Sequence, residues 1–200
     1  MSREIRSPGC RRRYARRKAT RTARQFLHDL QERLAKFGLT LHPDKTRLIE
    51  FGRFAVENRR KRGQGHPETF DFLGFTHCCG TNRQGGFQVV RLTVKKRMRT
   101  TLTAIRATLM RRHEPVAELG EWLNCVVQGY FNYHAVPGNL ASLWTFRFRL
   151  ARLWRTQLRQ RSQRYRCNWK RMNRLVARWL PQARLLHPWP AQRFAASHPG

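Results

Sequence analysis

The chain has 200 residues and carries 42 Lys and Arg against 11 Asp and Glu, a formal charge of +31 at pH 7. Because hydrophobic residues make up 40% of the sequence, the chain is too apolar for a purely disordered basic tail, and it is long enough to bury a core. Such a charge repels itself in the folded state, which argues against an ordinary enzyme for a small neutral substrate and favours a polyanionic partner: RNA, DNA or an anionic membrane.

Several other classes of protein are excluded by simple patterns. No run of about 18 apolar residues occurs, so we expect no membrane span. Arg11, Arg12 and Arg13 are not followed by an apolar segment, which argues against a secretory signal. The five cysteines are odd in number and include the adjacent Cys78 and Cys79, so we expect reduced thiols and a cytoplasmic location rather than a disulfide framework. No C-x-x-C pair occurs, and we expect no metal or cofactor in this chain.

The N-terminal region combines a basic segment with one amphipathic segment. Residues 1–24 contain ten Lys and Arg without an apolar period, and we expect them to form a disordered basic arm. From residue 25 to residue 37 the apolar positions recur at helical spacing, and Gly38 favours the end of a helix there. The sequence therefore predicts a first helix over 25–37.

Short apolar and aromatic segments bounded by turn residues come after this helix. Four segments alternate or carry aromatic residues as strands do, namely 39–41, 47–51, 70–75 and 87–92. Turn chemistry separates them at 42–45 and at 84–86. Residues 25–92 are therefore predicted to form a small α+β unit that packs on the C-terminal half of the chain, because a unit of this size is marginal alone.

From about residue 93 the apolar period becomes helical and stays so. Breaks at Glu114-Pro115, at the 136–139 turn and at Pro181 separate four predicted helices, whose apolar stripes we expect to form the core. The stripes are Val94, Met98, Leu102, Ile105 and Leu109; Leu119, Trp122, Leu123, Val126, Val127 and Tyr130; Leu140, Leu143, Trp144, Leu150, Leu153, Trp154 and Leu158; and Trp169, Met172, Leu175, Val176 and Trp179. The predicted fold is α+β and mainly α, with a helical bundle over 93–181 and an extended tail over 182–200.

Several ordered motifs resemble bacterial group II intron reverse transcriptase/maturases over about residues 25–195. The segments similar to the late palm of that family are 37–46, 51–55 and 70–77. The segments similar to its maturase-specific domain, also called the thumb or domain X, are 129–133 and 136–139, followed by its usual C-terminal run at 161–163 and 186–190. The resemblance implies a partial palm over 25–92 and a maturase-specific domain over 93–181.

The resemblance implies an RNA-binding maturase-type module of a mobile genetic element, which grips group II intron RNA and assists its splicing. The RNA would perform the transesterification with its own Mg²⁺. A polymerase of this family needs clustered carboxylates for two Mg²⁺ ions, but the three aspartates, Asp29, Asp44 and Asp71, include no adjacent pair and match none of the family's catalytic positions. We therefore expect a truncated chain without polymerase activity of its own and without catalytic residues.

Cations are the candidate RNA-binding residues. After Glu121 the sequence has no acidic residue but 14 Lys and Arg, so their mutual repulsion has no partner in that half of the chain. The expected phosphate contacts are Lys95, Lys96, Arg97, Arg99, Arg147, Arg149, Arg152, Arg155, Arg159, Arg161, Arg164, Arg166, Lys170, Arg171 and Arg174. The alternative interpretation is a set of solvated helix faces.

Two aromatic groups are weaker candidates. The segment Phe72, Leu73, Gly74 and Phe75 resembles the strand that supports the primer terminus in reverse transcriptases, and its glycine would let a nucleic-acid backbone approach closely. A packed aromatic strand is the alternative. A second group either stacks unpaired bases or packs in the core, and it consists of Tyr130, Phe131, Tyr133, His134 and Trp144.

Three rival functions stay open at this point. In the first, the chain is part of an RNA-directed DNA polymerase that works on DNA or an RNA–DNA duplex with a complementing N-terminal reverse-transcriptase fragment. Primer extension with and without that fragment tests it. In the second, the chain is a non-specific basic binder of nucleic acid or anionic membrane, for which tRNA and duplex DNA would compete as well as intron RNA. In the third, it is the product of a truncated or frameshifted gene and has no function.

Overall fold

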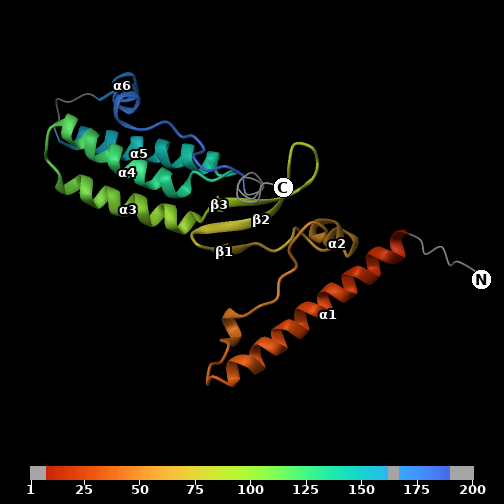
Figure 1. Cartoon of the computed structure of the whole chain (residues 1–200). Coiled ribbons are helices and arrows are strands. Elements are labelled where there is room, and N and C mark those ends of the chain that lie inside the picture. Colours follow the sequence, from red (N-terminus) through yellow and green to blue (C-terminus); the bar gives the residue numbers. More distant parts are fainter. Residues whose placement is uncertain (1–7, 162–166, 190–200) are drawn as a thin grey trace, which may run out of the picture. The chain divides into compact units, whose positions relative to one another are not determined.

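The computed structural model describes residues 8–161 and 167–189 and divides the chain into two compact units, Met1–Glu50 and Phe51–Gly200. In the first unit α1 spans Pro8–Ala35 and a short 3₁₀ helix, η1, spans Pro43–Lys45 (Figure 1). The second unit contains the remaining elements, which are α2 (Ala55–Lys61), β1 (Phe70–Phe72), β2 (Phe75–Thr81), β3 (Phe87–Thr93), α3 (Lys95–Arg111), α4 (Val116–His134), α5 (Leu140–Gln160) and α6 (Trp169–Trp179). The predicted mainly-α α+β fold is confirmed.

The division of the chain differs from the predicted one. The boundary between the units follows Glu50, so the first helix is separated from the strands with which it was expected to form a unit over 25–92. The strands instead belong to the same unit as the bundle. The sheet meets the bundle at one end, where Phe75 stacks on Tyr133 and the Thr93 N–H donates to Asn139.

Helix α1 begins much earlier than the sequence predicts. Residues 8–24 were expected to be disordered because they lack an apolar stripe, but they are helical. Arg, Lys and Ala dominate this segment and are strong helix formers, so local propensity accounts for a helix that periodicity does not reveal. The predicted stop at Gly38 is confirmed: its φ is +69°, and the N–H of Leu39 donates to the carbonyl of Leu34 at 3.0 Å.

Two predicted strands are wrong. Residues 39–41 and 47–51 lie outside any strand in the described chain, although the turn between them is present as η1, where the His42 carbonyl accepts from the N–H of Thr46 at 3.0 Å. Alternation of apolar residues reports a half-buried surface, whereas a strand also needs a neighbour that pairs with its backbone. The sheet of the described chain consists of β1, β2 and β3 and includes neither segment.

The predicted strand over 70–75 is a tight hairpin. β1 and β2 pair antiparallel with Phe72 opposite Phe75, and β3 pairs antiparallel with β2, so the strand order is β1-β2-β3. Leu73 and Gly74 form the two-residue turn with φ of +47° and +81°. Positive φ at both central positions is the conformation that matches the twist of the two strands. The aromatic run concealed this turn because Leu rarely adopts a positive φ.

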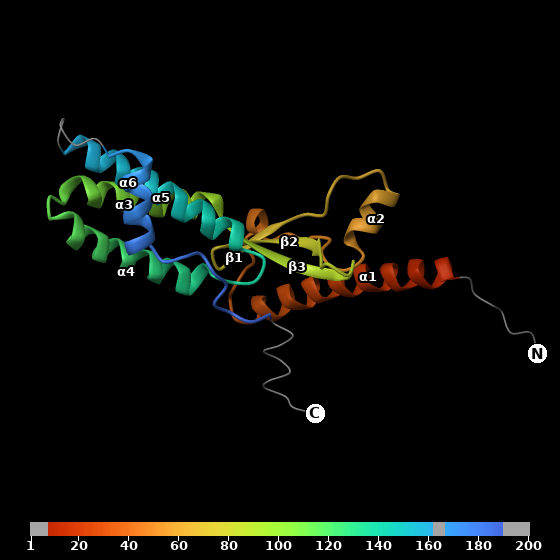
Figure 2. The same ribbon diagram turned by 90° about the horizontal axis from the view of Figure 1, so that it is seen from above.

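The four predicted bundle helices are confirmed. Helices α3, α4 and α5 run side by side, and α6 packs on α4 and α5 toward the end of the bundle away from the sheet (Figures 1 and 2). The largest fully buried side chains are Trp154, Phe131, Phe146, Leu109, Leu119, Leu123, Leu143, Leu150, Leu158 and Met172. Each of these contributes roughly 1.5–3 kcal/mol by leaving water. Among the described helices none is both long enough and apolar enough to span a membrane.

A buried polar link joins the sheet to the bundle. Asn139, which is fully buried, accepts from the Thr93 N–H at 2.9 Å through Oδ1 and donates to Thr93 Oγ1 and the His134 carbonyl, both at 2.8 Å. Every hydrogen-bonding group of this side chain except one lone pair therefore has a partner. The link fixes the end of β3 against the α4–α5 turn. It therefore also fixes the position of the start of α3, which follows β3, relative to α4.

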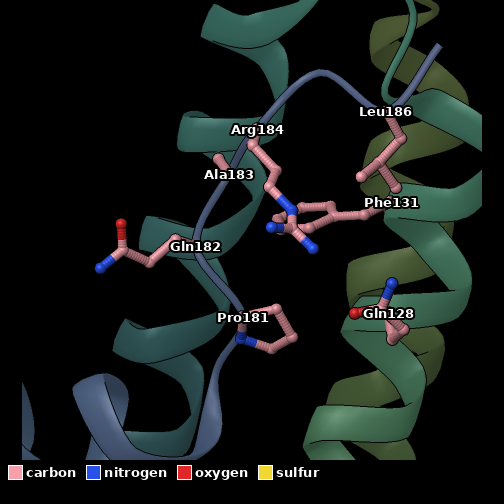
Figure 3. Close-up of a pocket in the computed structure, with 7 residues that line it drawn as sticks. All are labelled: Gln128, Phe131, Pro181, Gln182, Ala183, Arg184 and Leu186. Atoms are coloured by element: carbon pink, nitrogen blue, oxygen red, sulfur yellow. The ribbon is translucent and has the colours of Figure 1, made fainter.

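The described part of the tail has no helix or strand, as predicted, but it is docked on α4. The N–H groups of Leu186 and His187 donate to the Ala135 carbonyl at 3.0 and 3.2 Å. Between the tail and α4 lies a cavity of about 430 Å³ that Gln128 and Phe131 line on the helix side and Pro181–Arg184 and Leu186 on the tail side (Figure 3). The tail therefore covers part of the outer face of α4.

Candidate nucleic-acid interface

The first turn of α3 presents four cations to solvent. Lys95, Lys96, Arg97 and Arg99 are all exposed, and the turn contains no acidic residue. Cations at a helix N-terminus oppose the helix dipole, so they do not help the helix form. The charges of the cluster are therefore available for an anionic partner, although the Arg97 side chain also packs against Gly74.

The β1–β2 turn lies against this start of α3 and against the end of α4. The Gly74 carbonyl accepts from the Val94 N–H at 3.1 Å, and the Tyr133 hydroxyl donates to the Leu73 carbonyl at 2.6 Å. A Cβ on Gly74 would lie 3.4 Å from Nη1 of Arg97. Sequence reasoning named the turn and the cations separately, and the structure brings them together.

The four residues of the turn do not share one environment. Phe72 and Leu73 are 59% and 65% exposed, whereas Gly74 and Phe75 are buried. Gly74 is covered by the protein's own side chains, so what requires glycine there is its positive φ. The expected close approach of a nucleic-acid backbone to this glycine is therefore not available in this conformation, while the two exposed apolar side chains are.

Aromatic rings fill the space behind the turn. Tyr130 stacks on Phe146 with 3.6 Å between ring centroids and on His134 with 4.0 Å. Burial raises the pKa of Tyr130 to about 12. Burial also lowers the pKa of His134, against its hydrogen bond to the Tyr130 carbonyl, and the nearby charge of Arg97 lowers it further.

These contacts decide between the two interpretations of the aromatic group. Tyr130 and Phe131 are buried and belong to the core, and His134 is half-buried. Tyr133 and Trp144 are 50% and 47% exposed, so they are the two of the five that stay the best candidates for stacking on a base.

Three of the predicted RNA-binding arginines are used inside the protein. Arg147 donates to the carbonyls of Pro181, Val176 and Leu180 at 2.9, 3.2 and 3.1 Å, which completes the C-terminal end of α6. Burial lowers the pKa of this guanidinium. A cation at a helix C-terminus is favoured both by the unpaired carbonyls and by the helix dipole.

Arg155 and Arg161 bind backbone carbonyls of two connections between helices, the one before α6 and the one between α3 and α4. Arg155 donates to the Cys167 carbonyl at 3.0 Å, beside the start of α6. Arg161 donates to the carbonyls of Arg112 and Glu114 in the α3–α4 connection. All three guanidinium groups therefore hydrogen-bond backbone carbonyls, and we assign a structural role to Arg147, Arg155 and Arg161, which were predicted as phosphate contacts.

Other predicted cations of α5 and α6 lie on the surface. The exposed ones are Arg149, Arg152, Arg159, Lys170, Arg171 and Arg174. Arg164 and Arg166 lie outside the described residues. Neither α5 nor α6 contains an acidic residue, so these helices carry no carboxylate that would neutralise their own cations.

Sequence reasoning placed one aromatic residue in the wrong environment and missed another. Trp169 was assigned to a core stripe but is 39% exposed, and Phe148, which was in no stripe, is 57% exposed. Trp144, which was named both in a core stripe and among the stacking candidates, is 47% exposed. Trp144 and Phe148 are spaced i, i+4, beside the buried stripe of Leu143, Phe146 and Leu150. An aromatic i, i+4 pair off the main stripe is the signal that would have found them.

The carboxylates are scattered over the chain. Asp29 lies on α1, Asp44 in η1 and Asp71 in β1, where its carboxylate accepts from Thr76 Oγ1 at 2.6 Å. Among the side chains described, His28, Asp29 and Glu32 form the one group whose potential ligand atoms lie within 4.8 Å of one another. All three are exposed on one face of α1, and His28 is 3.6 Å from the Glu32 carboxylate.

Comparisons with protein-family models, with curated proteins and with solved structures find no match. The fold and the surface therefore define the class of protein on their own. It is a mainly-α α+β protein whose bundle carries exposed cations on α3, α5 and α6.

Proposed function

We propose that the chain is an RNA-binding module of the group II intron maturase type, which grips folded intron RNA and assists its splicing. The observation that carries the proposal is the exposed cationic surface of α3, α5 and α6, together with the absence of any acidic residue after Glu121 in the sequence. An anionic partner would replace the missing intramolecular one and relieve the repulsion among these cations.

Folded RNA suits this surface better than a small anion. The cations are spread along three helices, and the exposed side chains of α5 and α6 are mostly arginines, whose planar fork binds phosphate oxygens and stacks on bases. RNA helices are recognised mainly by their shape and backbone, which requires many phosphate contacts rather than a deep pocket. The resemblance of the motifs to group II intron maturases is the reason to propose group II intron RNA rather than another folded RNA.

In this proposal the protein binds and the RNA reacts. The chain stabilises the splicing-competent fold of the intron, while the RNA supplies the chemistry together with the Mg²⁺ that it binds. The site of action is the cytoplasm, with which the free thiols of Cys78, Cys79, Cys125 and Cys167 agree.

The test is a binding measurement with charge-matched variants. Lys95→Gln, Lys96→Gln and Arg99→Gln are combined in one protein, leaving Arg97 because it packs against Gly74. Each lost phosphate contact should lower the slope of log K against log salt by about 0.9, so the slope should fall by about 3 units. The control combines Arg60→Gln, Arg62→Gln and Arg83→Gln, which are exposed cations outside the bundle.

The control protein should keep the wild-type slope, and intron RNA should bind more tightly than tRNA or duplex DNA. Equal losses in both triple variants would assign the affinity to net charge rather than to this surface. Equal competition by tRNA and duplex DNA would replace the maturase proposal with non-specific binding.

A further inference from the structure

An exposed aromatic groove separates the outer faces of α5 and α6. It has a volume of about 500 Å³, and its aromatic lining consists of Trp144 and Phe148 on α5 and Trp169 on α6, with Ala151 and Val176 beside them. The three rings are 47%, 57% and 39% exposed. We call these three rings and the space between them the aromatic groove.

The core does not account for the aromatic groove. The inner face of α5 already packs the bundle through Phe146, Leu150 and Trp154, all fully buried. Large apolar side chains scattered singly on a surface are ordinary, but three that line one groove mark a binding surface. The rings therefore suit a partner that is itself flat and apolar over part of its surface.

Arginines surround the rings and fix two of them. The guanidinium carbons of Arg147, Arg152 and Arg155 lie over the rings of Trp144, Phe148 and Trp169, at 5.9, 6.0 and 4.7 Å from their centroids. Arg147 and Arg155 are themselves held by backbone carbonyls, so these cation–π contacts preset the orientation of both tryptophans. The groove is thus organised before any ligand enters.

The ring geometry and the charge point to the same chemistry. Phe148 and Trp169 are parallel within 6° with 6.3 Å between centroids, so they offer parallel faces to a planar group. The cations Arg149, Lys170 and Arg174 are exposed on the same two helices, which contain no acidic residue. A chain that combines flat rings with a regularly spaced negative charge is a single-stranded nucleic acid.

We propose that the aromatic groove binds unpaired bases of a single-stranded RNA segment, whose phosphates contact the exposed Arg149, Lys170 and Arg174. This inference rests on the proposed function and adds the feature of the RNA that α5 and α6 take: a loop or an end with splayed bases. A duplex keeps its bases inside, so duplex RNA reaches the cations but leaves the rings unused.

The experiment compares three probes of equal length: an oligouridylate, which has no secondary structure, its abasic analogue and a blunt RNA duplex. Trp144→Ala and Phe148→Ala should each weaken oligouridylate binding by about tenfold or more. Neither variant should change binding of the abasic oligomer or the duplex by more than about twofold. Trp144→Phe keeps a ring and should recover most of the lost affinity, which loss of folding would not allow.

Phe54→Ala is the matched control. Phe54 is 51% exposed and has Arg53 over its ring at 5.6 Å, but it lies outside the α5–α6 pair. This variant should bind oligouridylate as the wild type does. An equal loss in Phe54→Ala would contradict the assignment to the groove.

The outcomes separate the inference from the proposed function. Wild-type oligouridylate affinity in Trp144→Ala and Phe148→Ala, or equal binding of the abasic oligomer by the wild type, overturns the inference even where duplex binding is intact. A wild-type dimer that either variant dissociates, with oligouridylate affinity unchanged, also overturns it and assigns the groove to self-association. Failure of the wild type to bind any of the probes or the intron RNA contradicts the proposed function itself.

Discussion

Two sets of arginines on α5 lie within a few residues of each other and have different tasks. Arg147, with Arg155 on the same helix, points its guanidinium at backbone carbonyls of the α6 region, at distances between 2.9 and 3.2 Å. Arg149 and Arg159 are exposed on a helix without carboxylates. Arg147 binds carbonyls at the C-terminal end of α6 and Arg155 binds the connection before α6, whereas the second set leaves its charge for a partner.

This difference teaches that a cationic run cannot be interpreted as one surface. Arginine is long enough to reach a helix C-terminus from a neighbouring helix, and five donors let it bind several carbonyls at once. The predicted interface therefore loses Arg147, Arg155 and Arg161 and keeps the exposed cations. Stability and RNA binding should separate along the same line, and substitutions in each set test this separation.

The largest effect is expected from the inward set. Arg147→Met removes three charge-assisted hydrogen bonds and leaves the last carbonyls of α6 without that donor, so the free energy of unfolding should fall by about 3 kcal/mol. Urea unfolding followed by circular dichroism measures it. Arg149→Met, two residues away and exposed, should stay within about 0.5 kcal/mol of the wild type. Equal stabilities of the two variants would contradict the division.

A second effect on stability concerns the packing of α6 on α4. A Cβ on Gly120 would meet Cγ and Cδ2 of Trp179 at 2.5 Å, and the indole cannot bend away. Gly120→Ala should therefore cost about 2 kcal/mol through overpacking. Gly129 lies on the same helix with nothing within 4 Å of an added Cβ. Gly129→Ala should be neutral or raise stability by up to about 1 kcal/mol, because Ala favours the helix.

The outward set should affect binding alone. Arg149→Gln, Arg159→Gln and Arg174→Gln combined should leave the unfolding free energy within about 0.5 kcal/mol of the wild type. The slope of log K against log salt for intron RNA should fall by about 2–3 units. Arg147→Met, measured at a temperature where it is folded, should keep the wild-type slope. The reverse result would show that the inward arginines contact the RNA.

The smallest effect is expected from the half-buried His134. Burial lowers its pKa in the folded protein, so below about pH 6.5 the unfolded chain binds a proton that the folded chain does not. Stability should therefore be constant above that pH and fall as the pH drops toward the lowered pKa. Melting temperatures at several pH values from about 7.5 down to about 5 measure it, and His134→Phe should flatten the dependence. If the melting temperatures of the wild type and His134→Phe depend on pH in the same way, the proposed role of His134 is contradicted.

The bundle was predictable because its pattern is repeated. Leu102, Ile105 and Leu109 recur at helical spacing, and breaks such as Glu114-Pro115 mark the ends of the helices. The helix over residues 8–24 was not predicted, since its support is propensity rather than periodicity. The turn at Leu73 and Gly74 was concealed by a run of aromatic residues that is typical of one strand.

The site was predictable only in part. The sequence identifies the cations and shows that no acidic residue follows Glu121, but it does not show which groups each guanidinium contacts in the folded protein. Whether Arg147 meets a carbonyl or Trp144 meets water depends on where α6 packs across α5, and that is decided by contacts such as Trp179 on Gly120. Such tertiary contacts leave no trace in a single periodic pattern.

The central claim is that exposed cations of the bundle bind RNA phosphates, and the salt dependence of the wild-type affinity tests it most directly. Six or more phosphate contacts predict that affinity for folded intron RNA falls about 10³-fold or more between roughly 50 and 200 mM salt. An affinity that changes less than about tenfold over that range would mean that few phosphates are contacted, and it would contradict the account.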